Sequence, residues 1–302
     1  MCFILKMDKF QLLLLCFSIV HATFASPNQK AFVGVLNADF LVEWGFDSSS
    51  TIIDIKNRGI KSIEPLTFVG YTSLERLYLD NNQIDIITVD TFKGLTQLKS
   101  LYMWNNGIRQ IADNSFSDLV NLEDLVLTQN KIDKITAKTF NGLVKPVILN
   151  LQYNLISTIE DNSFANLNSL EILVLSYNRL RELGANTFNG LTNLKQLVLR
   201  NNLIATIDDN AFKSVKNLVY LIMVVNSIDK ITFETFRGLD KLEQLEIWSN
   251  KIKSIDNFSF QDLKSLENLD LGMQFLIIII INLYFISQCT VFNFKTIIAS
   301  HH

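Results

Sequence analysis

One 24-residue segment repeats along most of this chain. The copy at 74–97 reads LERLYLDNNQIDIITVDTFKGLTQ, further copies begin every 24 residues from Leu98 to Leu266, and a degenerate copy begins at Ser50. The shared pattern is LxxLxLxxNxIxxIxxxxFxxLxx. A single copy cannot bury its apolar side alone. The fixed period therefore predicts a solenoid in which neighbouring copies stack around one continuous core.

Two columns of the repeat are predicted to lie inside the solenoid. An Asn side chain at a fixed position can bond the backbone groups of neighbouring turns, which predicts a buried ladder and not a binding motif. The ladder comprises Asn82, Asn106, Asn130, Asn154, Asn178, Asn202, Asn226 and Asn250. Aromatic rings at another fixed position are predicted to stack in the wide outer half of each turn. These rings belong to Phe68, Phe92, Phe116, Phe140, Phe164, Phe188, Phe212, Phe236 and Phe260.

A second period of 48 residues underlies the first. Repeats that end in TFxGL, such as the one at Phe92, alternate with repeats that end in SFSDL, SFANL, AFKSV or SFQDL. Duplication of repeat pairs explains this alternation. In a functional alternative, the Asp-Asn-Ser triplets at 113–115 and 161–163 mark a binding strip on the convex side. The capping and turn chemistry of Asp, Asn and Ser accounts for the triplets without it.

The first 25 residues have the features of a secretory signal. Lys6 and Lys9 precede an apolar run at 10–20, and small-residue cleavage positions follow at Ala22 and Ala25. The alternative is a retained membrane anchor, but the run is shorter than the ~20 residues that a span needs.

Residues 26–49 are expected to form an N-terminal cap, in which FVGVLNADFLVEWGF pairs as a strand along the first repeat. Cys2 and Cys16 lie in the leader and Cys289 lies in the tail, so the array has no cysteine. Capping is therefore expected to be noncovalent.

The array is expected to span 50–273 as about ten repeats, the last incomplete, and an apolar tail follows at 274–302. A membrane span at 275–292 is one interpretation, with Lys295 on the cytoplasmic side. Its polar residues, such as Asn282, weaken this interpretation because polar groups are unfavourable in lipid. In a second interpretation, the tail is translated noncoding sequence that does not belong to the natural protein. In a third, the tail forms an apolar cap over the last turn.

The composition argues against catalysis. His21, His301 and His302 lie outside the array, which leaves it without an imidazole for a nucleophile pair or a His-ligated metal. Adjacent carboxylates such as Glu160 and Asp161 are expected to be solvated. We therefore predict no enzyme, catalytic residue, metal site or cofactor. The net charge of −3 argues against nucleic acid as a partner, since phosphate binding needs clustered Lys and Arg.

The pattern over 50–273, its period and the leader resemble the extracellular, typical subclass of leucine-rich repeat proteins. That group includes Toll ectodomains, Slit, chaoptin-like adhesion proteins and insect secreted immune repeat proteins. The resemblance implies an α/β repeat solenoid, a horseshoe with a concave parallel β-sheet and an irregular or short-helical convex side. It also implies a protein or peptide partner, or less often a glycan or lipid. The cysteine caps common in this group are missing here.

Function is expected on the sheet, where positions that flank the core Leu residues point away from the core. That face is charged at its ends and apolar and aromatic in the middle, which favours an interface. The alternative is that strand propensity alone selects these residues. The predicted contact residues are Tyr78, Tyr102, Trp104, Val126, Val174, Val198, Tyr220, Ile222, Val224 and Trp248.

Two functions are compatible with the sequence. The first is a secreted recognition module that binds an innate-immune, matrix or signalling protein. The second is an adhesion or receptor ectodomain held on the extracellular face of the plasma membrane by the tail. Asn257 begins the single Asn-x-Ser/Thr sequon and is the expected glycosylation site.

Overall fold

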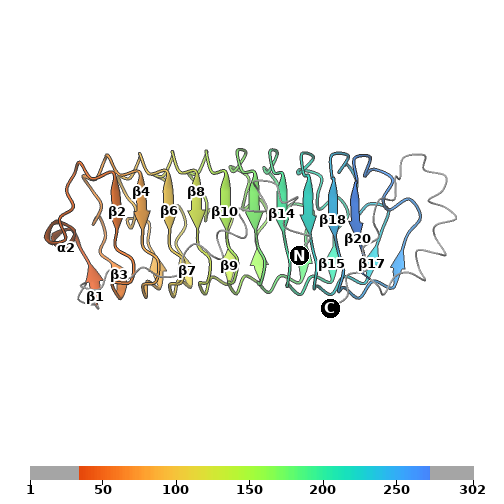
Figure 1. Cartoon of the computed structure of the whole chain (residues 1–302), viewed down its shortest axis with the longest axis horizontal. Helices are drawn as coiled ribbons and strands as arrows, with labels where there is room; N and C mark the ends of the chain where they lie inside the picture. The colour runs from red at the N-terminus through yellow and green to blue at the C-terminus, as the bar shows by residue number, and fades with distance from the viewer. Residues whose placement is uncertain (1–33, 273–302) are drawn as a thin grey trace, which may run out of the picture. The chain divides into compact units, whose positions relative to one another are not determined.

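The computed structural model describes residues 34–272. All of them belong to one compact unit, Phe32–His302, and the leader and tail lie outside the described residues. Within 34–272 the chain forms a stack of turns, with a long sheet on one side and short strands on the other (Figure 1). The predicted repeat solenoid is therefore confirmed.

The long sheet contains ten parallel strands in sequence order. Successive strands pair in register, so that residues 24 positions apart in the sequence lie opposite each other, such as Leu77 and Leu101 or Tyr78 and Tyr102. Equivalent residues of all repeats therefore form straight columns across the sheet. The strands are β2 (Ile52–Asp54), β4 (Arg76–Tyr78), β6 (Ser100–Tyr102), β8 (Asp124–Val126), β10 (Ile148–Asn150), β12 (Ile172–Val174), β14 (Gln196–Val198), β16 (Tyr220–Ile222), β18 (Gln244–Glu246) and β20 (Asn268–Asp270).

The return side is irregular apart from two-residue strands that pair only within alternate pairs of repeats. This pairing follows the 48-residue period of the sequence. The pairs are β5 (Ile86–Ile87) with β7 (Gln110–Ile111), β9 (Lys134–Ile135) with β11 (Thr158–Ile159), β13 (Glu182–Leu183) with β15 (Thr206–Ile207), and β17 (Lys230–Ile231) with β19 (Ser254–Ile255).

The two members of a repeat pair differ in where the backbone turns left-handed. One type has positive φ at the Gly after the core Phe, as at Gly94 with φ 87°. The other has it before the Phe, as at Asn114 and Asn162 with φ 62° and 64°. Ser115 and Ser163 are buried, and their hydroxyls donate to backbone carbonyls three residues earlier. Turn formation thus accounts for the Asn and Ser of both triplets.

The Phe column is confirmed as core. Rings from Phe68 to Phe236 are at most 2% exposed, and Phe260 packs partly buried against the same cluster. Seven consecutive pairs of these rings stack with centroids 5.8–6.5 Å apart. Strands in a sheet lie only about 4.8 Å apart, and the rings of Tyr78 and Tyr102 on the sheet are 4.9 Å apart. The turns therefore diverge toward the Phe side, which makes the sheet side concave.

The Asn ladder is also confirmed. The Oδ1 atom of Asn154 accepts from the Ile132 N–H at 3.1 Å, and its Nδ2 atom donates to Leu127 O and Leu151 O at 2.9 and 3.0 Å. The same bonds recur 24 residues on at Asn178. Each amide therefore bonds two successive turns, and the column has a structural role.

The N-terminal segment differs in part from the expected strand. A short strand, β1 (Gly34–Leu36), pairs parallel with β3 (Ile60–Ile63) on the return side and does not extend the ten-stranded sheet. The chain then forms the helix α2 (Ala38–Glu43), because the Asn37 side chain caps it by accepting from the Phe40 N–H at 3.1 Å. Leu36 and Leu41 are fully buried and close this end of the core.

Candidate functional site

The third residue of each long strand forms a column on the concave face. The middle residue of each strand, such as Leu77 or Leu101, belongs to the buried core, and side chains alternate between the two faces of a strand. Tyr78, Tyr102 and Val126 therefore lie on the face opposite the core. The predicted contact residues share this face, including Trp104 and Trp248, which follow their strands by two residues.

An aromatic cluster occupies the N-terminal part of this face. The rings of Tyr78 and Tyr102 stack with an interplanar angle of 5°, and the Lys56 ammonium lies 4.8 Å from the Tyr78 ring centroid. Asp80 is nearly fully buried, and its Oδ1 atom accepts from the Trp104 N–H at 2.8 Å. Neighbouring strands thus present one flat, half-buried aromatic surface with a cation at its end. We call Lys56, Tyr78, Tyr102 and Trp104 the aromatic cluster.

The pKa values of Tyr102 in the cluster and of the neighbouring Asp124 are shifted. Burial raises the pKa of the Asp124 carboxyl. A hydrogen bond that the carboxyl accepts from the Ser100 hydroxyl at 3.2 Å has the opposite, smaller effect and lowers the pKa. Burial also raises the pKa of Tyr102, and the charge of Asp124 adds to this effect. The Tyr102 hydroxyl therefore stays protonated well into the alkaline range and remains a hydrogen-bond donor at neutral pH.

The centre of the face differs from expectation. The sequence predicts that Val126, Val174, Val198 and Val224 are open to solvent, yet they are only 1–7% exposed. They are not members of the core cluster. Val126 lies opposite Tyr102 of the preceding strand, whereas Val174 lies between Asn150 and Val198. Other buried side chains on the same face are Ile172, Ser176 and Gln196.

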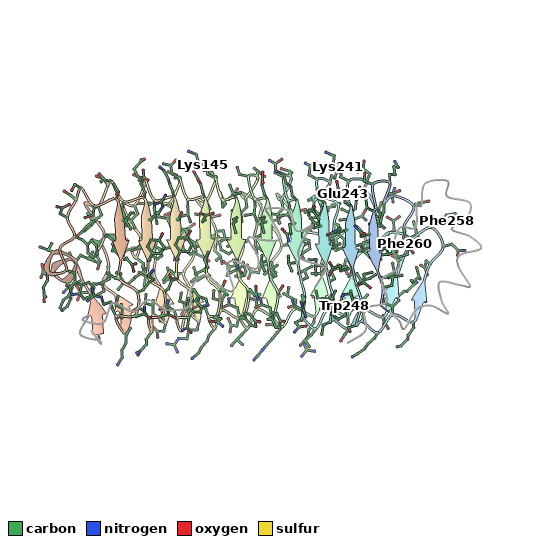
Figure 2. The ribbon with its side chains drawn as sticks, viewed as in Figure 1. Lys145, Lys241, Glu243, Trp248, Phe258 and Phe260 are labelled. Atoms are coloured by element: carbon green, nitrogen blue, oxygen red, sulfur yellow. The ribbon has the colours of Figure 1, made fainter. Side chains whose placement is uncertain are left out.

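The C-terminal part of the face combines an aromatic ring with charges. The Arg200 guanidinium lies 5.9 Å from the centroid of the Trp248 ring. Burial raises the pKa of Glu246, and the neighbouring charge of Asp270 adds to it, while Arg200 lowers it. Trp248, Tyr220 and Ile222 are half-buried. Figure 2 shows Lys145 and Lys241 projecting from the opposite edge, where the strands begin.

Comparison with known families identifies the repeat. The profile of the BspA type leucine rich repeat region matches residues 109–243 and 157–293, and a second leucine rich repeat profile matches residues 51–108. The chain belongs to the leucine-rich repeat family. No curated protein matches this leucine-rich repeat chain.

Three solved structures show the same fold. The TLR13–ssRNA13 complex aligns with a TM-score of 0.70 and 32% identity over 74% of this chain, which spans about a third (32%) of the TLR13 chain. A leucine-rich repeat protein of Leptospira interrogans, LIC12759, aligns with a TM-score of 0.60 and 22% identity over 70% of this chain and 54% of its own. A complex of latrophilin 3, Unc5D and FLRT2 aligns with a TM-score of 0.59 and 24% identity over 76% of each chain.

One aromatic pair lies outside the contact residues predicted from the sequence. Tyr153 and Tyr177 occupy the position before the ladder Asn, at the carboxyl ends of β10 and β12, and their rings stack with centroids 4.3 Å apart. Both residues have φ of 55°, a left-handed conformation that Asn adopts at 57, 81, 105 and 201. The detectable signal was an aromatic residue in a leucine-rich repeat column that otherwise favours Asn.

The predicted glycosylation site lies on the return side. Asn257 is exposed, while Ser259 of its sequon is buried and donates to Asp256 O at 2.7 Å. Phe258 between them is 63% exposed and points outward (Figure 2).

Between residues 34 and 272 no helix has the length and apolar character that crossing a membrane requires. In that same range, no group of His, Cys, Asp and Glu is arranged to hold a metal ion. The predicted span at 275–292 lies outside the described residues.

Proposed function

We propose that this chain is a non-enzymatic recognition module that binds a protein partner through its concave face. The aromatic cluster carries the proposal. Tyr and Trp are enriched at the centres of interfaces because they contribute large buried areas with few rotatable bonds. Here two stacked Tyr rings, a Trp and a Lys lie on neighbouring strands of a rigid sheet. At the end of the cluster, the Lys56 ammonium contacts the Tyr78 ring and is also ion-paired with Asp54 at 3.0 Å.

Two unpaired polar atoms lie on the same face. Among residues 34–272, Thr128 Oγ1 and Gln196 Oε1 are buried and have no hydrogen-bond partner. Both residues belong to columns of the concave face. Buried polar atoms without partners are uncommon in folded proteins. Both atoms are shielded from solvent, so a partner could bond them only after neighbouring side chains move.

Comparing partner binding by a concave-face variant with binding by two convex-side variants tests the proposal. We expect Trp104→Ala to weaken capture of the natural partner by about 2 kcal/mol or more, because truncating an aromatic anchor at the centre of an interface has that effect. Lys138→Ala and Lys213→Ala change exposed side chains on the convex side and serve as controls. Loss of binding in the controls, with binding retained in Trp104→Ala, would refute the assignment of the concave face.

Single-stranded RNA is a second candidate ligand. The TLR13 structure is a complex with single-stranded RNA, so the net charge of −3 is not sufficient to exclude nucleic acid for a related array. Stacked aromatic rings next to a cation also suit unpaired bases. Titration of the protein with a labelled single-stranded RNA at two salt concentrations tests this. RNA binding requires an affinity that falls as salt rises, and no binding at low salt rejects it.

We also propose that the module acts outside the cell, as the leader of Lys6, Lys9 and the run at 10–20 indicates. Three measurements on expressed protein test this location. N-terminal sequencing should find a start after Ala22 or Ala25, and Asn257→Gln should remove a glycan from the secreted form. Recovery from culture medium favours the free module, whereas recovery with membranes favours the alternative of a tail-held ectodomain. A start at Met1 would contradict cleavage.

A further inference from the structure

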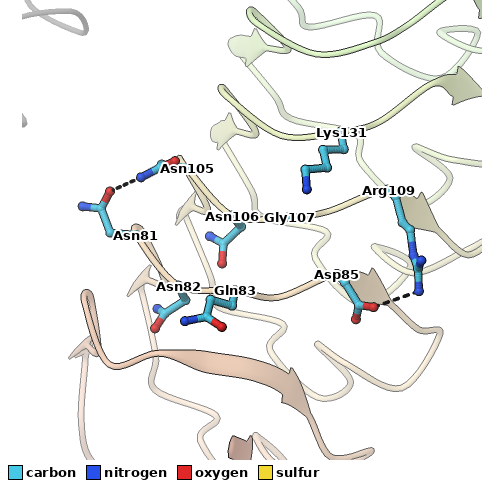
Figure 3. A pocket seen from close by; sticks show the side chains of 9 residues that line it. All are labelled: Asn81, Asn82, Gln83, Asp85, Asn105, Asn106, Gly107, Arg109 and Lys131. Atoms are coloured by element: carbon cyan, nitrogen blue, oxygen red, sulfur yellow. Dashed lines mark hydrogen bonds and ion pairs between the residues drawn. The ribbon is translucent and has the colours of Figure 1, made fainter. Parts of the chain in front are cut away.

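A polar pocket lies beyond the carboxyl ends of β4 and β6, on loops outside the concave sheet. Its volume is about 530 Å³, within the range of about 300–1,000 Å³ that small-molecule sites span. Figure 3 shows the loops of three successive repeats around it. The lining residues are Asn81, Asn82, Gln83, Asp85, Asn105, Asn106, Gly107, Arg109 and Lys131.

The pocket contains Gly107 at a position where most other repeats carry a longer side chain. The equivalent column reads Gly59, Gln83, Gly107, Lys131, Leu155, Arg179, Leu203, Ser227 and Lys251. Gly59 has φ of 72°, so its backbone favours glycine. Gly107 has no positive φ, and a Cβ atom there would approach nothing closer than Ile84 O at 3.7 Å. Neither the backbone nor the packing requires glycine at 107, and its missing side chain leaves a gap between Gln83 and Lys131.

The lining presents amides and one unbalanced positive charge. Asp85 and Arg109 form an ion pair at 2.9 Å, and the Asn105 Nδ2 atom donates to Asn81 Oδ1 at 2.8 Å. Among residues 34–272, no carboxylate pairs with the Lys131 ammonium. The Gln83 side-chain amide makes no hydrogen bond there, whereas its backbone N–H donates to Ile60 O at 2.7 Å. Figure 3 shows the Lys131 side chain extending toward the loop that carries Gly107. Asn82 and Asn106 belong to the ladder and already bond backbone groups. The Gln83 amide and the Lys131 ammonium are therefore the groups left to a ligand, and no aromatic or aliphatic side chain lines the pocket.

We propose that this pocket binds an acidic saccharide. The Gln83 side-chain amide donates and accepts at once, which suits the hydroxyl groups of a sugar ring. The Lys131 ammonium suits a single carboxylate or sulfate group on that ring, because charge-assisted hydrogen bonds are the stronger ones. The absence of an apolar lining disfavours a hydrophobic ligand. The site is separate from the aromatic cluster, and neither proposal depends on the other.

Calorimetric titration with a sulfated, uronate-containing disaccharide tests the proposal on the full chain. Gly107→Gln fills the gap and Lys131→Gln removes the cation, and we expect each to weaken binding about tenfold or more, which corresponds to about 1.4 kcal/mol. Gly107→Ala adds only a methyl group and should bind within about threefold of the parent, a difference of under about 0.7 kcal/mol. Ser227→Gln and Lys251→Gln alter the same column elsewhere and should leave binding unchanged.

Several outcomes would overturn the proposal. Failure of the parent protein to bind the disaccharide is one, and unchanged binding in Gly107→Gln is another. If Lys251→Gln weakens binding as much as Lys131→Gln, the attraction is a general surface charge effect. If inorganic sulfate alone competes as well as the disaccharide, or a neutral disaccharide binds equally, an acidic sugar is not what the pocket recognises. Thermal melts confirm that each variant is folded.

Discussion

Two glycines offer a matched test of how closely neighbouring turns pack on the return side. Gly190 and Gly238 are equivalent members of the 48-residue unit, with φ of 90° and 79°. A Cβ atom on Gly190 would lie 2.4 Å from Ala165 O and 2.5 Å from Ala165 Cα. A Cβ atom on Gly238 would meet nothing within 4 Å. Alanine at the two positions therefore differs in steric contact but not in the backbone conformation it must adopt.

The expected magnitudes follow from these two terms. Alanine in a left-handed conformation costs about 1–2 kcal/mol, and Gly238→Ala should lower the free energy of unfolding by that amount. In Gly190→Ala the clashing atoms belong to the backbone, so the turn of Ala165 must move by about 1 Å to restore contacts of about 3.5–4.0 Å. Overpacking of this kind adds about 1–3 kcal/mol. The total for Gly190→Ala is then about 2–5 kcal/mol.

Urea unfolding followed by tryptophan fluorescence and circular dichroism measures the difference. We expect the midpoint of Gly190→Ala to lie clearly below that of Gly238→Ala, with the parent highest. Gly142→Ala should behave like Gly190→Ala, because its Cβ atom would lie 2.4 Å from Ser117 Cα. Equal midpoints for Gly190→Ala and Gly238→Ala would refute the close approach of these turns.

Three further predictions concern other columns of the repeat. Asn154→Ala should lower the free energy of unfolding by about 1–3 kcal/mol because buried backbone groups lose their partner, whereas Asn193→Ala, which removes one exposed bond, should match the parent in the same melts. Glu246→Gln should stabilise the fold at neutral pH and lose this advantage in acid. The pKa of the Glu246 carboxyl is raised in the folded state, so the carboxyl favours folding below its unfolded pKa, and this contribution is lost as pH rises through the folded pKa. A difference in melting temperature between variant and parent that does not change with pH would contradict this. Val225→Asn should stabilise by about 1 kcal/mol, since Val225 has φ of 56° and left-handed β-branched residues are strained; an unchanged or lower melting temperature would reject that explanation.

The repeat itself made most of the fold predictable. Leu and Phe at fixed spacing determine which side chains face the core, and the ladder Asn determines where each turn follows its strand. The 48-residue period was also visible in the sequence. The structural basis of this period could not be predicted from the sequence. It lies in the backbone, which turns left-handed before the core Phe in one repeat, as at Asn114, and after it in the next, as at Gly94. The helix α2 was missed because its Asn37 cap lies inside an apolar stretch that reads equally well as a strand.

The candidate site was less predictable than the fold. A column assigns a side chain to a face but does not determine its exposure. Val174 lies on the predicted face between Asn150 and Val198 and is nevertheless 1% exposed. The gap at Gly107 depends on a comparison across repeats, since a glycine becomes informative only next to the side chains of Gln83 and Lys131.

From 81 to 249, the residue before each ladder Asn has a positive φ, including Gln129, Val225 and Ser249. Asn fits that conformation with little strain because its short polar side chain bonds locally, whereas Tyr does not gain that benefit. Tyr153 and Tyr177 nevertheless occupy it, and their stacked rings offset part of the strain, since aromatic pairs contribute about 0.5–1.5 kcal/mol beyond their buried area. Tyr153 remains 42% exposed despite this contact. Aromatic residues are enriched at protein interfaces, so this exposed pair extends the proposed binding surface from the concave face toward the carboxyl ends of β10 and β12.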